Sequence, residues 1–171
     1  MTLRSPKLRL FVPLFALSLL SDCSSKRVAV AQLTPELVPH DVIGDVVRFT
    51  LAYNVRAAMG LSAGPASRWV FALLAVGMLI GVAVWMLRSD SDDPMMLSGF
   101  GLVAGGAAGN LIDRLRWDRG VVDFIDIGVG DSRFYIFNIA DAAITVGVAL
   151  LWLALRRADR RGRDGETRAV A

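Results

Sequence analysis

The sequence is short of the residues on which many hydrolytic and metal sites are built, with one cysteine and one histidine among 171 residues. A single thiol, Cys23, cannot form a disulfide within the chain. With His40 as the only imidazole, histidine-based triads and multi-histidine zinc sites lack their material. Ser24 and Ser25 adjoin Lys26, but side chains at such offsets do not face each other on a helix, which disfavours a serine–lysine pair. Carboxylates and amides remain as candidate reactive groups.

Charge is absent from three long stretches of the chain. Apolar residues make up 54% of the sequence and the mean hydropathy is +0.51, which is unusual for a soluble domain of this size. Segments 69–87 and 94–112 carry no charged residue, and segment 134–155 carries only Asp141. Each segment is long enough to cross about 30 Å of hydrocarbon as a helix.

The first apolar segment, 10–21, is shorter than the others. It spans a membrane only if the helix continues through "DCSSKRVAVA", which carries Asp22 and Lys26 at or near an interface. A rival interpretation is a lipoprotein signal peptide, because basic residues, an apolar stretch and Cys23 follow in that order. Such a signal needs a small residue before the cysteine, where this chain has Asp22, so we expect the segment to remain as an anchor. The sequence thus predicts four transmembrane helices, at about 10–30, 69–87, 94–115 and 134–155.

Lysine and arginine are most concentrated in the two tails of the chain. This density places both tails in the cytoplasm and the connections 32–67 and 113–133 on the outer side. We expect residues 1–157 to form a single membrane domain, and the basic tail 158–171 to be disordered near anionic membrane lipids. No aromatic residue is interleaved with the charges of the tail, so we expect no nucleic-acid partner.

The outer connection 32–67 is the largest piece outside the apolar segments. Its stretch "DVVRFTLAYN" is rich in β-branched and aromatic residues and predicts a strand or two, and "GLSAGPAS" predicts a loop before the second helix. The piece is too short for a core of its own. The predicted fold is an all-α integral membrane protein with four transmembrane helices and a small β-containing cap from this connection on the outer face.

Glycines recur in the third apolar segment at a spacing of four residues, at Gly101, Gly105 and Gly109. A ridge of small residues lets a neighbouring helix approach closely in a membrane. We expect this ridge to bring the ends of helices three and four close together.

Polar residues cluster at the adjoining ends of helices three and four. In "GNLIDR", helical spacing puts Asn110, Asp113 and Arg114 on one face, and we expect Asp113 and Arg114 to belong to a structural ion-pair network. In "FNIAD", Asn138 and Asp141 share a face in the same way. Both clusters pair a carboxylate with an amide.

Asp123, in "GVVDFIDIG", is a second carboxylate in apolar surroundings. Residues 124–136 can return the chain to the same depth, so Asp123 and Asp141 could meet. Two close carboxylates in a poorly solvated site share a proton, and such a pair can activate water with one acid as general base and the other as general acid, without a metal. The competing interpretation is that Asp141 caps helix four and Asp123 is an ordinary loop acid. Spacing alone favours neither.

At these residues the sequence resembles a known family. "GNLIDRLRWDRGVVDFIDIG" followed by "FNIADAAITVG" is similar to the paired signature of the lipoprotein signal peptidases (signal peptidase II), which are bacterial four-helix membrane aspartic proteases. "DCSSK" resembles the family's Asp-x-x-Ser-Lys, here Asp22, Ser25 and Lys26. "YNVRAAM" resembles its Asn-x-Gly-Ala-Ala-Phe. The four motifs occur in order and cover most of residues 10–155.

The resemblance implies that Asp123 and Asp141 are the catalytic pair of an aspartic endopeptidase. The polar residues that it places around the site are Asn110, Arg114, Asn138 and Asn54, with Asp113 as a further supporting residue. The implied substrate is a prolipoprotein whose cysteine already carries diacylglycerol, cut just before that cysteine near the outer face of the bacterial cytoplasmic membrane. Neither a cofactor nor a metal is implied, and we expect a monomer. The chain departs from the family pattern at Arg56 and Met59, where the family has glycine and phenylalanine.

Three alternatives stay open on the sequence. "GVGD", 128–131, spells the Gly-x-Gly-Asp motif of another class of membrane aspartic protease, but it lies in a polar turn, where Asp131 is expected to be a solvated acid. A proton-coupled transporter with Asp141 as carrier would place that acid nearer the middle of a helix. A non-catalytic scaffold would tolerate Asn in place of Asp123 or Asp141.

Overall fold

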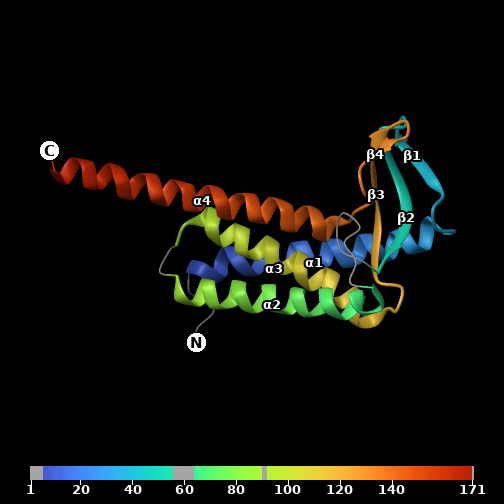
Figure 1. Ribbon diagram of the computed structural model, residues 1–171, viewed down its shortest axis with the longest axis horizontal. Helices are drawn as coiled ribbons and strands as arrows, with labels where there is room; N and C mark the ends of the chain where they lie inside the picture. The colour runs from blue at the N-terminus through green and yellow to red at the C-terminus, as the bar shows by residue number, and fades with distance from the viewer. Residues whose placement is uncertain (1–5, 56–63, 90–91, 171) are drawn as a thin grey trace.

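The protein is a bundle of four long helices with a small antiparallel sheet at one end (Figure 1). The computed structural model describes residues 6–55, 64–89 and 92–170. The helices are α1 (Pro6–Gln32), α2 (Ser67–Arg88), α3 (Pro94–Arg116) and α4 (Ile139–Val170). By length and composition all four can cross a membrane, which confirms the four predicted spans. A short 3-10 helix, η2 (Gly64–Ala66), leads into α2.

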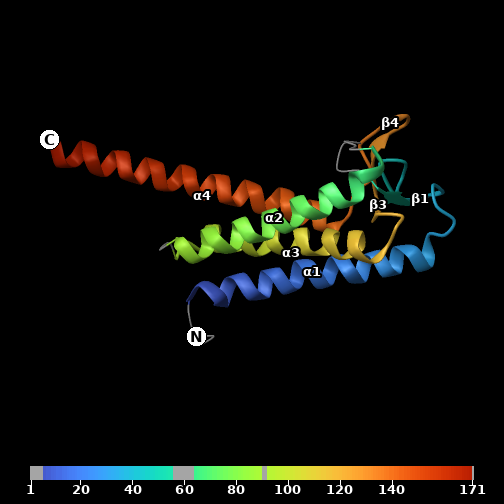
Figure 2. The same cartoon turned by 60° about the horizontal axis from the view of Figure 1, so that its bottom comes forward.

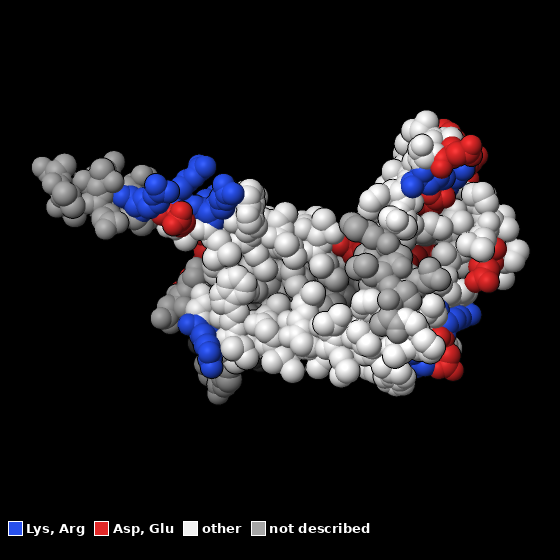
Figure 3. All heavy atoms as spheres, viewed as in Figure 1, with Lys and Arg blue, Asp and Glu red and all other residues white. Residues whose placement is uncertain are grey.

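The outward faces of the helices are apolar. Leu20 on α1 is 64% exposed and Leu73 on α2 is 71% exposed. In a water-soluble bundle such residues would turn toward the core, whereas lipid tails around a membrane bundle accept them on the outside. Figure 3 shows the same pattern on one face, where the middle of the bundle is mostly white and charged atoms gather toward the two ends.

The central helix is α3, which lies against α1, α2 and α4 (Figure 2). Small residues permit these contacts, because an added Cβ at Gly101 would lie 2.9 Å from the carbonyl oxygen of Phe11 on α1. An added Cβ at Gly106 would lie 2.5 Å from the carbonyl oxygen of Ala140 on α4. The prediction that the four-residue glycine ridge joins helices three and four was therefore wrong. The ridge packs on α1, and the α4 contact uses Gly106, whose direction is about 100° further around the helix than that of Gly105.

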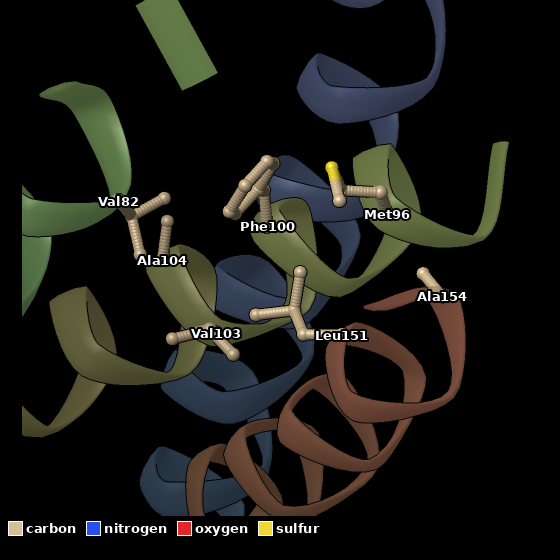
Figure 4. Packing of buried hydrophobic residues seen from close by; sticks show 7 residues of the cluster. All are labelled: Val82, Met96, Phe100, Val103, Ala104, Leu151 and Ala154. Carbon is tan, nitrogen blue, oxygen red and sulfur yellow. The ribbon is translucent and has the colours of Figure 1, made fainter. Parts of the chain in front are cut away.

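A hydrophobic core fills the bundle at the end remote from the sheet, between α2, α3 and α4 (Figure 4). Phe100 of α3 is fully buried there, and its ring packs edge-on against Trp85 at 5.1 Å between centroids. The other buried members of this core are Val82, Met96, Val103, Ala104, Leu151 and Ala154. This packing holds α4 against α3 at the end of the bundle remote from the sheet.

The sheet has four antiparallel strands in the order β1 (Pro39–Ile43), β2 (Val47–Asn54), β3 (Val121–Val129) and β4 (Ser132–Arg133). The connection 32–67 supplies β1 and β2, as predicted. Strands β3 and β4 come from the connection 113–133 and were not predicted. In the register, Tyr53 lies opposite Val122, and Ala52 lies opposite Asp123. The sheet thus joins the two connections and places Asp123 on a strand.

The boundaries of α4 differ from the prediction at both ends. The helix begins at Ile139 instead of residue 134, because Phe137 forms a bridge with Ile125 of β3 and Asn138 lies just before the first turn. It continues to Val170, where a disordered tail was expected from residue 158. The tail is rich in Ala and Arg and has no Pro, and extending an existing helix needs no new nucleus.

The start of α1 and the end of α4 lie at one end of the bundle, and the sheet lies at the other (Figure 1). The connections 32–67 and 113–133 therefore lie at the end at which α1 and α3 finish and α4 begins. Polar residues from three helices and one sheet can meet there.

Candidate active site

Asp123 lies on β3, at the end of the bundle that carries the sheet, and its side chain is buried. Its two carboxylate oxygens each accept a hydrogen bond from a side-chain amide. Asn138 Nδ2 donates to Oδ1 at 2.7 Å, and Asn54 Nδ2 donates to Oδ2 at 3.0 Å. Asn54 ends β2, and the antiparallel pairing of β2 with β3 brings its amide to Asp123.

Asp141 lies in the first turn of α4 and is partly exposed. It forms a reciprocal pair of bonds with Asn138, the residue before the helix. Asp141 N–H donates to Asn138 Oδ1 at 3.0 Å, and Asn138 N–H donates to Asp141 Oδ2 at 3.2 Å. This is the geometry of a capping box, which satisfies otherwise unpaired donors at a helix N-terminus. Asp141 therefore belongs to the cap of α4, and its partner in the cap, Asn138, is also the residue that donates to Asp123.

Two amides join the two carboxylates. The Asn138 amide that donates to Asp123 also donates to Asn110 Oδ1 at 3.1 Å. Asn110 Nδ2 then donates to Asp141 Oδ1 at 2.8 Å. Asn138 is fully buried, so it contacts both carboxylates in a position closed to water. Strand β3 and helices α3 and α4 thus converge on one small site.

Lys26 of α1 fixes the direction of the Asn110 amide. Its ammonium group donates to Asn110 Oδ1 at 2.9 Å, and an ammonium group has no acceptor atom. The oxygen of Asn110 must therefore face Lys26, and its NH₂ group must face Asp141. Lys26 is also 2.7 Å from Asp22 Oδ2 and 2.9 Å from Asp113 Oδ2, and all three side chains are largely buried.

The ion-pair network expected of Asp113 has a different cation. The sequence analysis paired Asp113 with Arg114, whereas the structure pairs it with Lys26. Consecutive helical residues point about 100° apart, and Asp113 faces α1. Sequence reasoning missed Lys26 and Asp22 as site-supporting residues. The available signal was their i, i+4 spacing, opposite charge and position in an apolar helix.

Arg114, on α3, is a buried cation near the two carboxylates. One guanidinium nitrogen donates to the carbonyl oxygen of Asn110 at 3.2 Å, and the guanidinium group lies over the ring of Phe71 at 5.9 Å. Its positive charge acts on Asp141 and Asp123. Arg114 therefore compensates part of the negative charge at the site.

The electrostatic environment keeps a proton on Asp123 up to neutral pH. Burial is the largest cause, the negative charge of Asp141 adds to it, and the hydrogen bonds from Asn54 and Asn138 oppose it. Together they raise the pKa of Asp123 to about 7 from an ordinary value of 3.8. A protonated carboxylic acid beside a second, partly exposed carboxylate can donate and accept protons at the same pH.

Comparison with known proteins identifies the family of this chain. The family model described as signal peptidase (SPase) II matches residues 14–157. The chain belongs to the signal peptidase II family. The family assignment made from the four motifs is thereby confirmed. Residues outside the match include the last part of α4.

Several lipoprotein signal peptidases are similar to this member of the signal peptidase II family. The protein of Mycolicibacterium smegmatis is 40% identical over 87% of this chain and 61% of its own length. That of Chlorobium luteolum is 36% identical over 88% of this chain and 93% of its own. That of Coxiella burnetii is 44% identical over 61% of this chain and 65% of its own. The chain thus spans less than two thirds of some relatives and nearly all of another.

Solved structures of bacterial membrane enzymes have the same fold as this family member. One is 29% identical with a TM-score of 0.76, and covers 85% of this chain and 87% of that chain. Another is 30% identical with a TM-score of 0.73, and covers 84% of this chain and 90% of that chain. The arrangement of four spanning helices with a small sheet is therefore shared.

Two other residues singled out from the sequence, Asp131 and His40, are solvent-exposed. Asp131 lies in the turn after β3, and His40 lies on β1. In the part of the chain that the structure describes, no group of three or more His, Cys, Asp or Glu side chains is placed to hold a metal ion. The departures at Arg56 and Met59 lie outside the described residues.

Proposed function

We propose that the protein is a membrane aspartic endopeptidase that removes signal peptides from diacylglyceryl-modified prolipoproteins, cutting just before the lipidated cysteine. The observation that carries this proposal is the pair of carboxylates from β3 and α4 that are bound by one buried residue, Asn138. Family membership supports the substrate class. The convergence of Asp123 and Asp141 on the same amide network supports the reaction type.

The reaction begins with one proton on the pair. Burial and the negative charge of Asp141 raise the pKa of Asp123 to about 7, so we assign this proton to Asp123. Asp141 takes a proton from water as the water oxygen attacks the scissile carbonyl carbon, and Asp123 gives its proton to the carbonyl oxygen. The tetrahedral diol then collapses. The leaving amine takes the proton from Asp141, one diol hydroxyl returns a proton to Asp123, and the C–N bond breaks. These two proton transfers return the pair to its starting state with one proton.

The surroundings of the pair suit both halves of the substrate. The acyl chains of the lipidated cysteine can stay against the apolar outer faces of the helices, in hydrocarbon, while the peptide bond reaches the polar end of the bundle. Arg114 offsets the negative charge that builds up as the carbonyl is attacked. We place the start of α1 and the end of α4 in the cytoplasm, from the density of basic residues, and the site at the outer face.

The decisive experiment is cleavage of a lipidated prolipoprotein by purified wild type, Asp123→Asn and Asp141→Asn. Each substitution removes one proton-transfer group, and such a group contributes about 10²–10⁴-fold to a rate. It also leaves no second carboxylate with which the proton can be shared. Both variants are expected to lose activity by at least about 10³-fold while keeping their helical content. Asp131→Asn is the matched control, because that acid is exposed in a turn, and should cleave at the wild-type rate. Substantial cleavage by either dyad variant would contradict the proposal.

A further inference from the structure

A pocket of about 200 Å³ opens between α1 and the end of α3, at the sheet end of the bundle. It lies on the other side of β3 from the carboxylate pair, because Val122 lines it and neighbouring strand residues point to opposite faces. The mechanism above uses none of its exposed residues. Its lining is basic and aromatic, with apolar residues beneath: Arg27, Arg116, Arg119, Trp117, Val30 and Ile112.

Three arginines at this pocket have no acidic partner in the described parts of the chain. Arg27, Arg116 and Arg119 are exposed, and none of them forms an ion pair there. The acids nearby are already engaged. Asp118 binds Arg68, while Asp113 at the pocket wall binds Lys26. The pocket mouth therefore carries uncompensated positive charge.

Aromatic rings hold two of these arginines in place. The guanidinium group of Arg116 lies 5.0 Å from the ring centroid of Trp117, and that of Arg119 lies 5.1 Å from the same ring. Arg119 also lies 4.0 Å from the ring centroid of Tyr53. Stacking orients the two cations while their N–H donors stay available. Tryptophan at the end of a spanning helix is typical of the membrane interface, the depth at which lipid phosphates lie.

An apolar surface continues from the pocket toward the middle of the membrane. Leu20 lies on the same face of α1 as Cys23 and Arg27 by helical spacing, and it is 64% exposed. Ile112, at the pocket wall, is 39% exposed. A ligand held by the arginines could therefore place hydrocarbon along α1 and α3. A soluble anion would leave this surface unused.

From this combination we propose that the pocket binds the phosphate of an anionic phospholipid, with its acyl chains along α1 and α3. The phosphodiester accepts hydrogen bonds from Arg27, Arg116 and Arg119, which is the geometry for which guanidinium groups are suited. This site is separate from the carboxylate pair and does not depend on the proposed peptidase activity. It provides a lipid contact at the level of Lys26, which lines the pocket and also binds Asn110.

The test uses Trp117 as a local reporter. In a full-length variant with Trp69→Phe, Trp85→Phe and Trp152→Phe, quenching of the remaining tryptophan is measured in nanodiscs that mix phosphatidylglycerol and phosphatidylcholine. In one set the phosphatidylglycerol carries brominated acyl chains, and in the other the phosphatidylcholine does. We expect about a tenfold preference for phosphatidylglycerol, because three cations without an acidic partner attract an anionic headgroup and salt screens part of this attraction.

The preference should fall to near one in the variant Arg27→Gln/Arg116→Gln/Arg119→Gln. Arg48→Gln is the control at the same end of the molecule, because Arg48 is already paired with Asp41, and it should keep the preference. Native mass spectrometry of lipid retained by proteins with all four tryptophans repeats the comparison if the reporter variant folds poorly.

Three results would overturn the lipid assignment. The first is equal quenching by both lipids, and the second is an unchanged preference in the triple variant. The third is displacement of phosphatidylglycerol by excess inorganic phosphate but not by chloride at equal ionic strength, which would make the ligand a soluble phosphate. Retention of the lipid in inorganic phosphate supports the proposal.

Discussion

Burial of Asp123 beside Asp141 should make the folded protein less stable as pH rises. The pKa of Asp123 is about 7 in the folded chain and has an ordinary value of 3.8. Between these values the folded state binds more protons than the unfolded state, so each increase in pH favours unfolding. The stability gained from the proton is fully present below about pH 4 and is lost as pH rises through about 7.

The size of this effect follows from proton linkage. We integrated the difference in protons bound by the folded and unfolded states, given the two pKa values of Asp123, from pH 5 to pH 8. The result is a loss of about 3 kcal/mol in the free energy of unfolding. For a chain of this length, each kcal/mol corresponds to about 2–4 °C in Tm. Thermal unfolding in detergent micelles, followed by tryptophan fluorescence at steps between pH 5 and pH 8, measures the slope directly.

The variant Asp123→Asn carries no titrating proton at this position, so its Tm should depend less on pH by the same amount. The absolute Tm of this variant tests the buried proton less directly than the pH dependence of its Tm does. Both oxygens of Asp123 accept amide donors, and an asparagine amide would turn its own NH₂ toward one of them. Asp131→Asn should keep the wild-type slope, because it removes an exposed acid at the same end. Equal slopes for wild type and Asp123→Asn would refute the assignment of the buried proton.

Three further substitutions test the supporting contacts. Lys26→Met should lower the free energy of unfolding by about 3–5 kcal/mol in chemical denaturation, because it leaves two buried carboxylates without their cation. Gly109→Ala should cost about 1–3 kcal/mol in the same assay, since its Cβ would collide with the carboxylate of Asp22, and an unchanged midpoint would contradict the packing. Asn138→Ser should keep Tm within a few degrees as a good helix cap. It should nevertheless lose most peptidase activity, because a hydroxyl cannot replace the amide that holds Asp123.

The membrane spans could be predicted from the sequence because charge is excluded from them over long distances. Their order and number follow from hydropathy alone, and α3 ends within one residue of its predicted end. The strand β3 was harder to predict, since "VVDFIDIGV" pairs with β2 across more than sixty residues of sequence. Only the tertiary pairing decides whether such an apolar run, too short to span, becomes strand or loop.

The site was predictable in its residues and not in its connections. Helical spacing placed Asn138 with Asp141, and the family motifs added Asn54 and Asn110. The partner of Asp113 depended on the rotation of α3 against α1, which is set by glycine contacts along the whole interface. A single sequence does not fix that rotation, so the neighbouring Arg114 looked like the natural partner. The structure instead pairs Asp113 with Lys26 of α1.

Asn138 links folding to chemistry at this site. The bonds that start α4 at Ile139 are the bonds that fix the Asp141 carboxylate, because Asp141 is the third residue of the helix and returns a bond to Asn138 N–H. The same side chain binds Asp123 on β3. Had the helix begun at residue 134, as hydropathy suggested, Asn138 would have been inside the helix and its main-chain N–H would have bonded to the preceding turn. Because α4 starts at Ile139, Asn138 can form hydrogen bonds to both carboxylates.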